Sequence, residues 1–234
     1  MHSSFRFCFF RIFILFLAAG FFLSCSDSVL RITSINQTYI IDFFDQTAAP
    51  DISLSLFVQT DSEVRKVDQL RVTHVSSNFF WDVKDITLLQ GKNNNNWAGY
   101  SNFKAVQGSD FPQGRYNLCL TDKAGNQCET SFIINVPEEL KSPDLKSAEE
   151  YLKKENVQFT KSIALYDENE ILLYLGEESE DLDSTEEYIQ NYPSATSVRN
   201  VYQLNGATIA IKFPPQKFNQ DDLTAGEKEN SSGE

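Results

Sequence analysis

The stretch that decides the fold reads PQGRYNLCLTDKAGNQCETSFIINV and runs from Pro112 to Val136. Apolar and polar side chains alternate on both of its arms, with the apolar positions at Tyr116, Leu118, Leu120, Phe132, Ile134 and Val136. A period of two predicts strands that bury one face. Between the arms, Asp122–Asn126 reverses the chain and includes Gly125, which adopts a positive φ at little cost. The stretch therefore predicts a β-hairpin.

This hairpin resembles the last hairpin of bacterial immunoglobulin-like and fibronectin type III-like domains. There the chain often follows the pattern P-x-G-x-Y-x-V-x-V-x-D-x-x-G-N, which stands here as Pro112, Gly114, Tyr116, Leu118, Leu120, Asp122, Gly125 and Asn126. The resemblance covers the hairpin closely and the rest of residues 31–137 loosely. It implies an immunoglobulin-like β-sandwich over residues 31–137, in which Trp81 is the buried aromatic residue of a middle strand.

Two cysteines, Cys119 and Cys128, lie on the two arms of the hairpin. An even pair of cysteines in an exported chain predicts a disulfide, which forms in an oxidising compartment. A bridge here is local and differs from the inter-sheet bridge of antibody domains. The alternative is two free, buried thiols.

Export is indicated by residues 1–24. Arg6 and Arg11 precede the apolar segment IFILFLAAGFFL, Ile12 to Leu23, which is too short to span a bilayer as a helix and is typical of a secretory signal peptide. The following Phe22-Leu23-Ser24-Cys25 resembles the lipobox of bacterial lipoproteins, with Phe22 where Leu is usual, a departure that spirochaete lipoproteins tolerate. The resemblance implies acylation of Cys25, for example by palmitate, and a lipidated tether over residues 25–30. The alternative is an ordinary cleaved signal with an accidental cysteine.

From Pro137 onward the pattern changes, and residues 142–213 predict a small α+β domain. A helix is expected near residues 143–156, with a capping box at Ser147 and Glu150. Two hairpins and a second helix, capped by Asp183 or Ser184, complete the domain. Segments 147–176 and 184–213 align at an offset of 37 positions without a gap, which indicates either a duplicated αββ unit or chance. Two such units are expected to form four antiparallel strands with both helices on one face. Residues 214–234 are polar and charged and predict a disordered acidic tail.

Charge excludes one class of partner. The whole chain has a net charge of −13, and loss of the two signal arginines makes it −15. Residues 137–234 alone carry 21 acidic and 9 basic residues, which repel phosphate backbones, so we expect no nucleic-acid binding. The acidic run Glu177–Asp183 lacks the glycine and the spacing of a calcium loop and predicts a solvated connection.

No catalytic constellation is recognised in the sequence. After removal of the signal, His74 is the one remaining histidine, and its place in a strand pattern indicates a structural role. No metal ligands with zinc spacing and no phosphate-binding or dinucleotide motif occur, so no metal and no cofactor is expected. The aromatic doublets Phe43-Phe44 and Phe79-Phe80 place one ring of each on an outer face, which hints at a protein partner.

The sequence thus predicts a lipoprotein of the bacterial cell envelope, periplasmic or surface-exposed. Its lipid anchors it to a membrane, and it acts as a non-enzymatic binding or scaffolding module for an envelope or host protein. The alternative is an envelope hydrolase or transferase that uses carboxylates of the C-terminal domain. The sequence assigns neither the ligand nor the oligomeric state.

Overall fold

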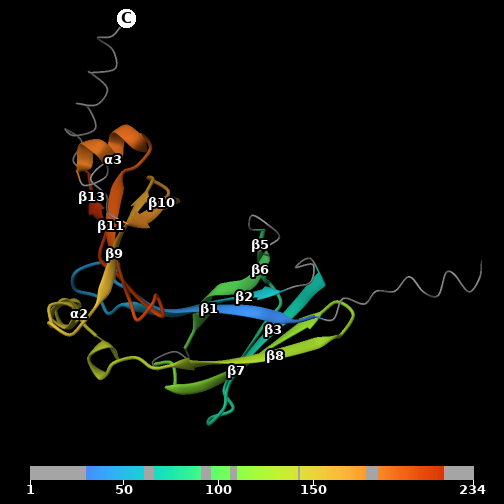
Figure 1. Ribbon diagram of the computed structural model, residues 1–234. Coiled ribbons are helices and arrows are strands. Elements are labelled where there is room, and N and C mark those ends of the chain that lie inside the picture. Colours follow the sequence, from blue (N-terminus) through green and yellow to red (C-terminus); the bar gives the residue numbers. More distant parts are fainter. Residues whose placement is uncertain are drawn as a thin grey trace, which may run out of the picture.

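The computed structural model describes residues 30–60, 66–90, 96–105, 110–141, 143–177 and 184–218. These residues form two β-sheets, a short 3-10 helix and two α-helices (Figure 1). The strands are β1 (Ile32–Asp42), β2 (Asp51–Thr60), β3 (Val67–His74), β4 (Phe80–Val83), β5 (Thr87–Gln90), β6 (Asn96–Lys104), β7 (Gly114–Asp122), β8 (Gln127–Ile134), β9 (Phe159–Tyr166), β10 (Leu172–Glu177), β11 (Ser197–Leu204), β12 (Ile209–Lys212) and β13 (Gln216–Lys217). The helices are η4 (Glu138–Leu140), α2 (Leu145–Leu152) and α3 (Thr185–Asn191).

The fold is therefore β-rich. The larger sheet has the order β10-β9-β11-β12-β1-β2-β6-β5, with β13 beside β11, and the smaller sheet has the order β4-β3-β7-β8. One apolar core joins the two sheets, because inward-facing side chains of both belong to the same cluster, among them Leu54, Leu56, Val58, Leu70, Val72, Leu118 and Leu120. Neither helix in the described part of the chain has the length and apolarity that a membrane span requires.

The hairpin from Pro112 to Val136 forms as the alternation predicts. Strand β7 pairs with β8 without a register shift, and the inward side chains Tyr116, Leu118 and Leu120 are buried. At the turn, the Asp122 carboxylate accepts hydrogen bonds from the backbone N–H groups of Ala124 and Asn126 at 2.9 and 2.8 Å. Gly125 has φ +86°, the conformation for which glycine is suited.

Trp81 occupies a different place from the one expected. It lies in β4, which is the end strand of the smaller sheet and not a middle strand, and it is half-buried. Its ring stacks on Phe111 at 5.4 Å between centroids, and its Nε1–H donates to the Lys104 carbonyl at 2.7 Å. The indole thereby ties the edge of the smaller sheet to β6 of the larger one.

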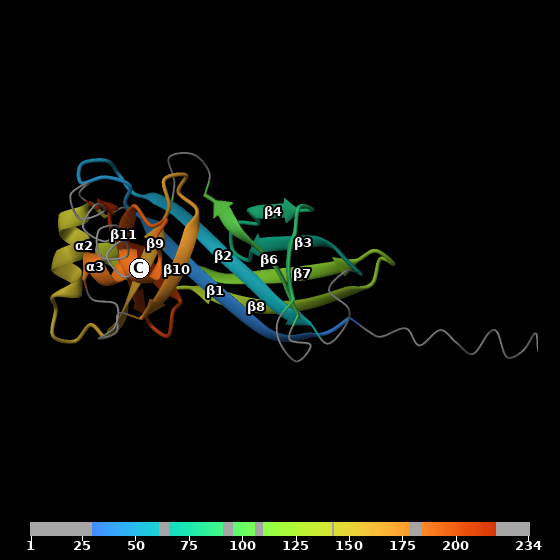
Figure 2. The same cartoon turned by 90° about the horizontal axis from the view of Figure 1, so that it is seen from above.

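The C-terminal segment contains the predicted order of helix, hairpin, helix, hairpin. Strands β10, β9, β11 and β12 are antiparallel neighbours, as expected, but they do not form a separate sheet. Strand β12 pairs with β1 in parallel, from Tyr39 opposite Ile209 to Asp42 opposite Lys212, so one sheet continues from the N-terminal half into the C-terminal half. Figure 2 places α2 and α3 at one end of the molecule and the β7–β8 turn at the other.

Two local predictions about this segment are corrected. Helix α2 begins at Leu145 and is capped by Asp144, whose side chain accepts hydrogen bonds from the Ser147 N–H at 2.7 Å and from its hydroxyl at 2.6 Å, so Ser147 is not the cap. The cap of α3 is Ser184, one of the two candidates that the sequence offered, and it forms a capping box with Glu187. The tail is ordered to Phe218, because β13 pairs with β11 and the Phe218 ring stacks on Tyr188 at 6.1 Å. Residues 219–234 lie outside the described residues.

Candidate binding groove

A groove lies where one strand of each sheet has no neighbour on one side. Strand β8 ends the smaller sheet. Strand β1 pairs with β2 along its length, whereas β12 covers only Tyr39–Asp42, which leaves the other side of Ile32–Thr38 unpaired within the described part of the chain. These two free edges face each other, and two adjoining pockets of about 250 and 450 Å³ fill the space between them. We call both pockets together the β1–β8 groove.

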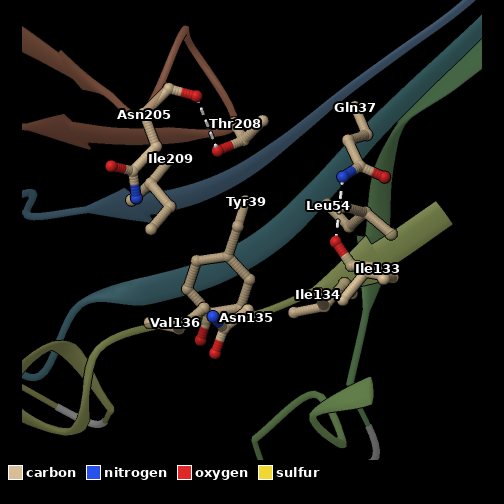
Figure 3. Close-up of a pocket in the computed structure, with 10 residues that line it drawn as sticks. All are labelled: Gln37, Tyr39, Leu54, Ile133, Ile134, Asn135, Val136, Asn205, Thr208 and Ile209. Atoms are coloured by element: carbon tan, nitrogen blue, oxygen red, sulfur yellow. Dashed lines mark hydrogen bonds between the residues drawn. The ribbon is translucent and has the colours of Figure 1, made fainter. Parts of the chain in front are cut away.

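One side chain bridges the two edges of the groove. The Gln37 Nε2 of β1 donates a hydrogen bond of 2.9 Å to the Ile133 carbonyl of β8 (Figure 3). Only the amide nitrogen can donate to a carbonyl, so this partner identifies Nε2 and Oε1 of Gln37. The other amide atom, Oε1, is buried and has no hydrogen-bond partner among the described residues. A buried acceptor without a partner costs about 1–3 kcal/mol, which offsets the free energy gained from the Nε2 hydrogen bond. The bridge therefore holds the two edges together only weakly.

The third wall of the groove is the connection between β11 and β12. Its backbone turns through three consecutive positive φ angles at Asn205, Gly206 and Ala207. The Tyr39 N–H donates to the Thr208 carbonyl at 2.9 Å, and the Thr38 hydroxyl donates to the Ala207 carbonyl at 2.9 Å. These bonds fix the turn against β1, at the point where β12 begins and the open edge ends.

The lining of the groove combines apolar side chains with neutral polar ones. The apolar part includes Ile35, Leu54, Ile133, Val136 and Ile209, and the amides are those of Asn36, Gln37, Asn135 and Asn205. Among the described residues that line the groove, Arg115 is the one that carries a charge. A third pocket of about 480 Å³, next to α2, adjoins the groove at Asn205 and Gly206 and is lined without any charged residue. Apolar walls with a few fixed polar groups are typical of binding sites.

Cys119 and Cys128 are not joined by a disulfide in the part of the chain that the structure describes, which contradicts the predicted bridge. In the β7–β8 register Cys119 lies opposite Glu129, and Cys128 lies opposite Leu120. Cys119 and Cys128 are therefore one position out of register, and their side chains lie on opposite faces of the hairpin. Burial raises the pKa of the Cys119 thiol, which keeps it in the less reactive protonated form.

The strand pattern predicts a structural role for His74, and its contacts agree with one. The imidazole is buried, its Nδ1 lies 2.7 Å from the Ser77 hydroxyl, and its Nε2 lies 3.1 Å from the Gln113 carbonyl. Its ring also packs on Tyr116 at 4.8 Å. Both ring nitrogens are thus used to hold the loop after β3 and the turn before β7.

The aromatic doublets expose one ring each, as the alternation predicts. Phe43 is buried and Phe44 is exposed, while Phe79 is half-buried and Phe80 is exposed. The exposed rings do not gather in one patch, because Phe44 lies under the Arg199 guanidinium and Phe80 lies under that of Arg71. They add no binding site to the groove.

Other predicted sites fall outside the described residues. Cys25 is one of them, and so is the acidic run Glu177–Asp183, of which only Glu177 is described. No group of three or more His, Cys, Asp or Glu side chains with metal-binding geometry occurs in the part of the chain that the structure describes.

Sequence reasoning missed the groove entirely. Its walls come from β1, β8 and the β11–β12 connection, and no local motif marks the residues that line it. Comparison of the chain with protein-family models, curated proteins and solved structures found no match.

Proposed function

We propose that the chain is a lipid-anchored lipoprotein of the bacterial cell envelope that acts as a non-enzymatic binding module and uses the β1–β8 groove as its binding site. The single observation that carries the binding role is the groove itself, in which two strand edges that no described strand pairs meet over a lining with one described charged residue. Anchoring rests on the lipobox-like Phe22-Leu23-Ser24-Cys25.

The groove lies close to the proposed anchor along the chain. Ile32, the first residue of β1, follows Cys25 by seven positions. An extended chain spans at most about 3.6 Å per residue, so the first strand begins within about 25 Å of the acylated cysteine. A partner bound in the groove would be held near the membrane surface, as expected for an envelope scaffold.

We also propose that the two packed sheets form an immunoglobulin-like sandwich. Support comes from Tyr116, whose hydroxyl donates a 2.6 Å hydrogen bond to the Pro112 carbonyl four residues upstream. A tyrosine near the start of a late strand that bonds back to the preceding corner is a hallmark of such sandwiches. Domains of this architecture commonly serve as binding modules on cell surfaces, which agrees with the proposed role.

The alternative, a hydrolase or transferase, needs convergent carboxylates, one of them with a raised pKa. Glu139 and Asp144 in the C-terminal half show the opposite shift. Hydrogen bonds from Lys154 and from Ser147, respectively, lower the pKa of these carboxyl groups. Both are exposed, and neither lines one of the three pockets. No observation among the described residues favours the alternative.

The proposal is tested by a matched pair of substitutions. Ile133 in the groove is 56% exposed, and Ile171, the residue before β10, is 59% exposed. A displayed library of random hexapeptides is selected on the mature protein, and the retained peptides are measured against Ile133→Asp and Ile171→Asp. We expect Ile133→Asp to weaken binding at least tenfold and Ile171→Asp to change it less than twofold. Equal binding to both variants would contradict a site in the groove.

A further inference from the structure

We infer that the occupant of the β1–β8 groove is an extended protein segment that adds to β8 as a further strand and carries a carboxylate for Arg115. This inference rests on the proposed function, because it names the partner chemistry of the same groove. Three observations support it: the direction of the free backbone groups of β8, the displaceable Gln37 bridge, and the Arg115 guanidinium, which no described residue pairs.

The free backbone groups of β8 point into the groove. The Ile133 carbonyl accepts from Gln37 of β1, so it is directed away from β7. Successive residues of a strand direct their N–H and C=O groups to alternate sides, so Ser131 also presents its backbone to the groove, whereas Phe132 faces Tyr116 of β7. Once β1 and β8 have moved apart, an extended segment beside β8 meets donors and acceptors at the spacing of a sheet ladder, which is how strand addition provides affinity.

The Gln37 side chain occupies the position that a backbone N–H of the segment would take. The side chain satisfies the Ile133 carbonyl with Nε2 while its own Oε1 stays buried without a partner among the described residues. A backbone N–H of the incoming segment replaces Nε2 as the donor to this carbonyl. The released Gln37 amide then reaches water or the backbone of the segment, so the exchange keeps a hydrogen bond at the Ile133 carbonyl and removes one buried, unpaired acceptor.

Arg115 selects the charge of the segment. It lies directly opposite Ile133 in the β7–β8 register, so both side chains are on the outer face, and its side chain reaches the groove lining. Among the described residues the exposed Arg115 guanidinium has no hydrogen-bond or ion-pair partner. Guanidinium groups bind carboxylates with two parallel hydrogen bonds. Although the chain has a net charge of −13, no described acidic side chain pairs with Arg115, which favours an acidic ligand.

The position of the carboxylate follows from the sheet geometry. A side chain of the added strand that lies opposite Ile133 is on the same face as Arg115. Two strand spacings, about 10 Å, separate its Cα from that of Arg115. The side chains of Arg115 and of a Glu opposite Ile133 are together long enough to meet across this distance. An Asp at the next position on the same face of the added strand is an alternative. The preferred segment is therefore extended, with one acidic residue opposite Ile133 and an apolar residue beside it.

The test uses the retained hexapeptides and the mature protein, with two readouts. Amide hydrogen exchange at residue resolution should show that a bound peptide protects the Ser131 and Ile133 amides. The Phe132 amide, which already bonds to β7, should change little. Arg115→Gln should weaken binding of peptides that contain an acidic residue about tenfold and reduce its salt dependence. Lys66→Gln, which makes the same change in charge at an exposed position outside the groove lining, should have less than a twofold effect.

The outcomes separate the two proposals. In the first outcome, Ile133→Asp abolishes peptide binding, but the β8 amides gain no protection and Arg115→Gln has no effect. This outcome would overturn strand addition and leave the groove as a binding site. Peptide binding that neither substitution changes would overturn the groove itself and the inference with it.

Discussion

Arg199 of β11 and Asp42 of β1 form a buried ion pair across 157 positions of the sequence. The guanidinium also donates to the Phe43 carbonyl at 2.9 Å and to the Phe213 carbonyl at 2.8 Å, and Lys212 lies 3.4 Å from the other Asp42 oxygen. The pair lies where β12 joins β1, so it fastens the C-terminal strands to the N-terminal half. The same junction ends the open edge of the β1–β8 groove.

The two partners of this ion pair should respond differently to removal. Asp42→Ala leaves a buried guanidinium whose remaining hydrogen-bond acceptors among the described residues are two carbonyl groups, and we expect it to lower the free energy of unfolding by about 3–5 kcal/mol. Arg199→Met removes the buried charge and leaves Asp42 with Lys212, so its effect should be smaller, about 1–3 kcal/mol. Urea unfolding at pH 7 measures both. Equal losses, or losses below about 1 kcal/mol, would show that the pair does not fasten the junction.

The cysteines should remain thiols in the folded protein. Because Cys119 and Cys128 lie on opposite faces of their hairpin, a reducing agent should leave the melting temperature unchanged. Alkylation after unfolding, followed by intact-mass analysis, should find both sulfur atoms labelled without prior reduction. A sample that labels only after reduction, and that melts lower when reduced, would contradict the β7–β8 register.

The turn of the same hairpin should contribute a pH-dependent stability. Hydrogen bonds from Asn126, through its side-chain amide first and its backbone N–H next, lower the pKa of the Asp122 carboxyl group. A carboxyl with a lowered folded-state pKa contributes its full stability above the unfolded pKa, about 3.9, and loses it as the pH falls through the folded value. The free energy of unfolding should therefore drop between pH 5 and pH 3 less steeply in Asp122→Asn than in the wild type. Parallel pH profiles of the two proteins would refute this role.

The turn at the end of the groove offers a pair of opposite substitutions. Ala207 has φ +67° and Gly206 has φ +65°. Both angles lie in the left-handed region, which costs a residue with a Cβ about 1–2 kcal/mol. Ala207→Gly should therefore raise the free energy of unfolding by about 1 kcal/mol, and Gly206→Ala should lower it by about the same amount. No atom lies within 4 Å of a Cβ added at Gly206, so a steric clash does not confuse the comparison. Thermal or urea unfolding of both variants measures the two signs. Two effects of the same sign would contradict this turn geometry.

The sequence predictions are accurate where a feature depends on residues that are close together in the sequence. The hairpin from Pro112 to Val136 is determined by alternation and by a local turn, and both are visible in the sequence. The pairing positions of Cys119 and Cys128 could also have been predicted from the sequence. Asp122 donates its N–H to the Asn126 carbonyl at 3.0 Å to close the turn, and counting back from this pair puts Cys119 opposite Glu129. The cap of α2 was misassigned because Ser142, Asp144 and Ser147 are all good capping residues.

The groove could not be predicted in the same way. It exists because β12 pairs with only the last four residues of β1, and that pairing depends on contacts such as Asp42 with Arg199 between distant parts of the chain. Gln37 has no local signal, since a glutamine in an alternating strand is usually a solvated residue. The ordered tail has the same cause, because Phe218 packs on Tyr188 only once β13 has paired with β11.

The central claim is that a lipid on Cys25 holds this binding module at a membrane. The most direct measurement is intact mass together with detergent partitioning, for the chain expressed in a bacterial host beside Cys25→Ala. We predict loss of residues 1–24, added acyl mass on the wild type, and partitioning into detergent that the substitution abolishes. A processed chain without acyl mass that stays in the aqueous phase would contradict the anchored role.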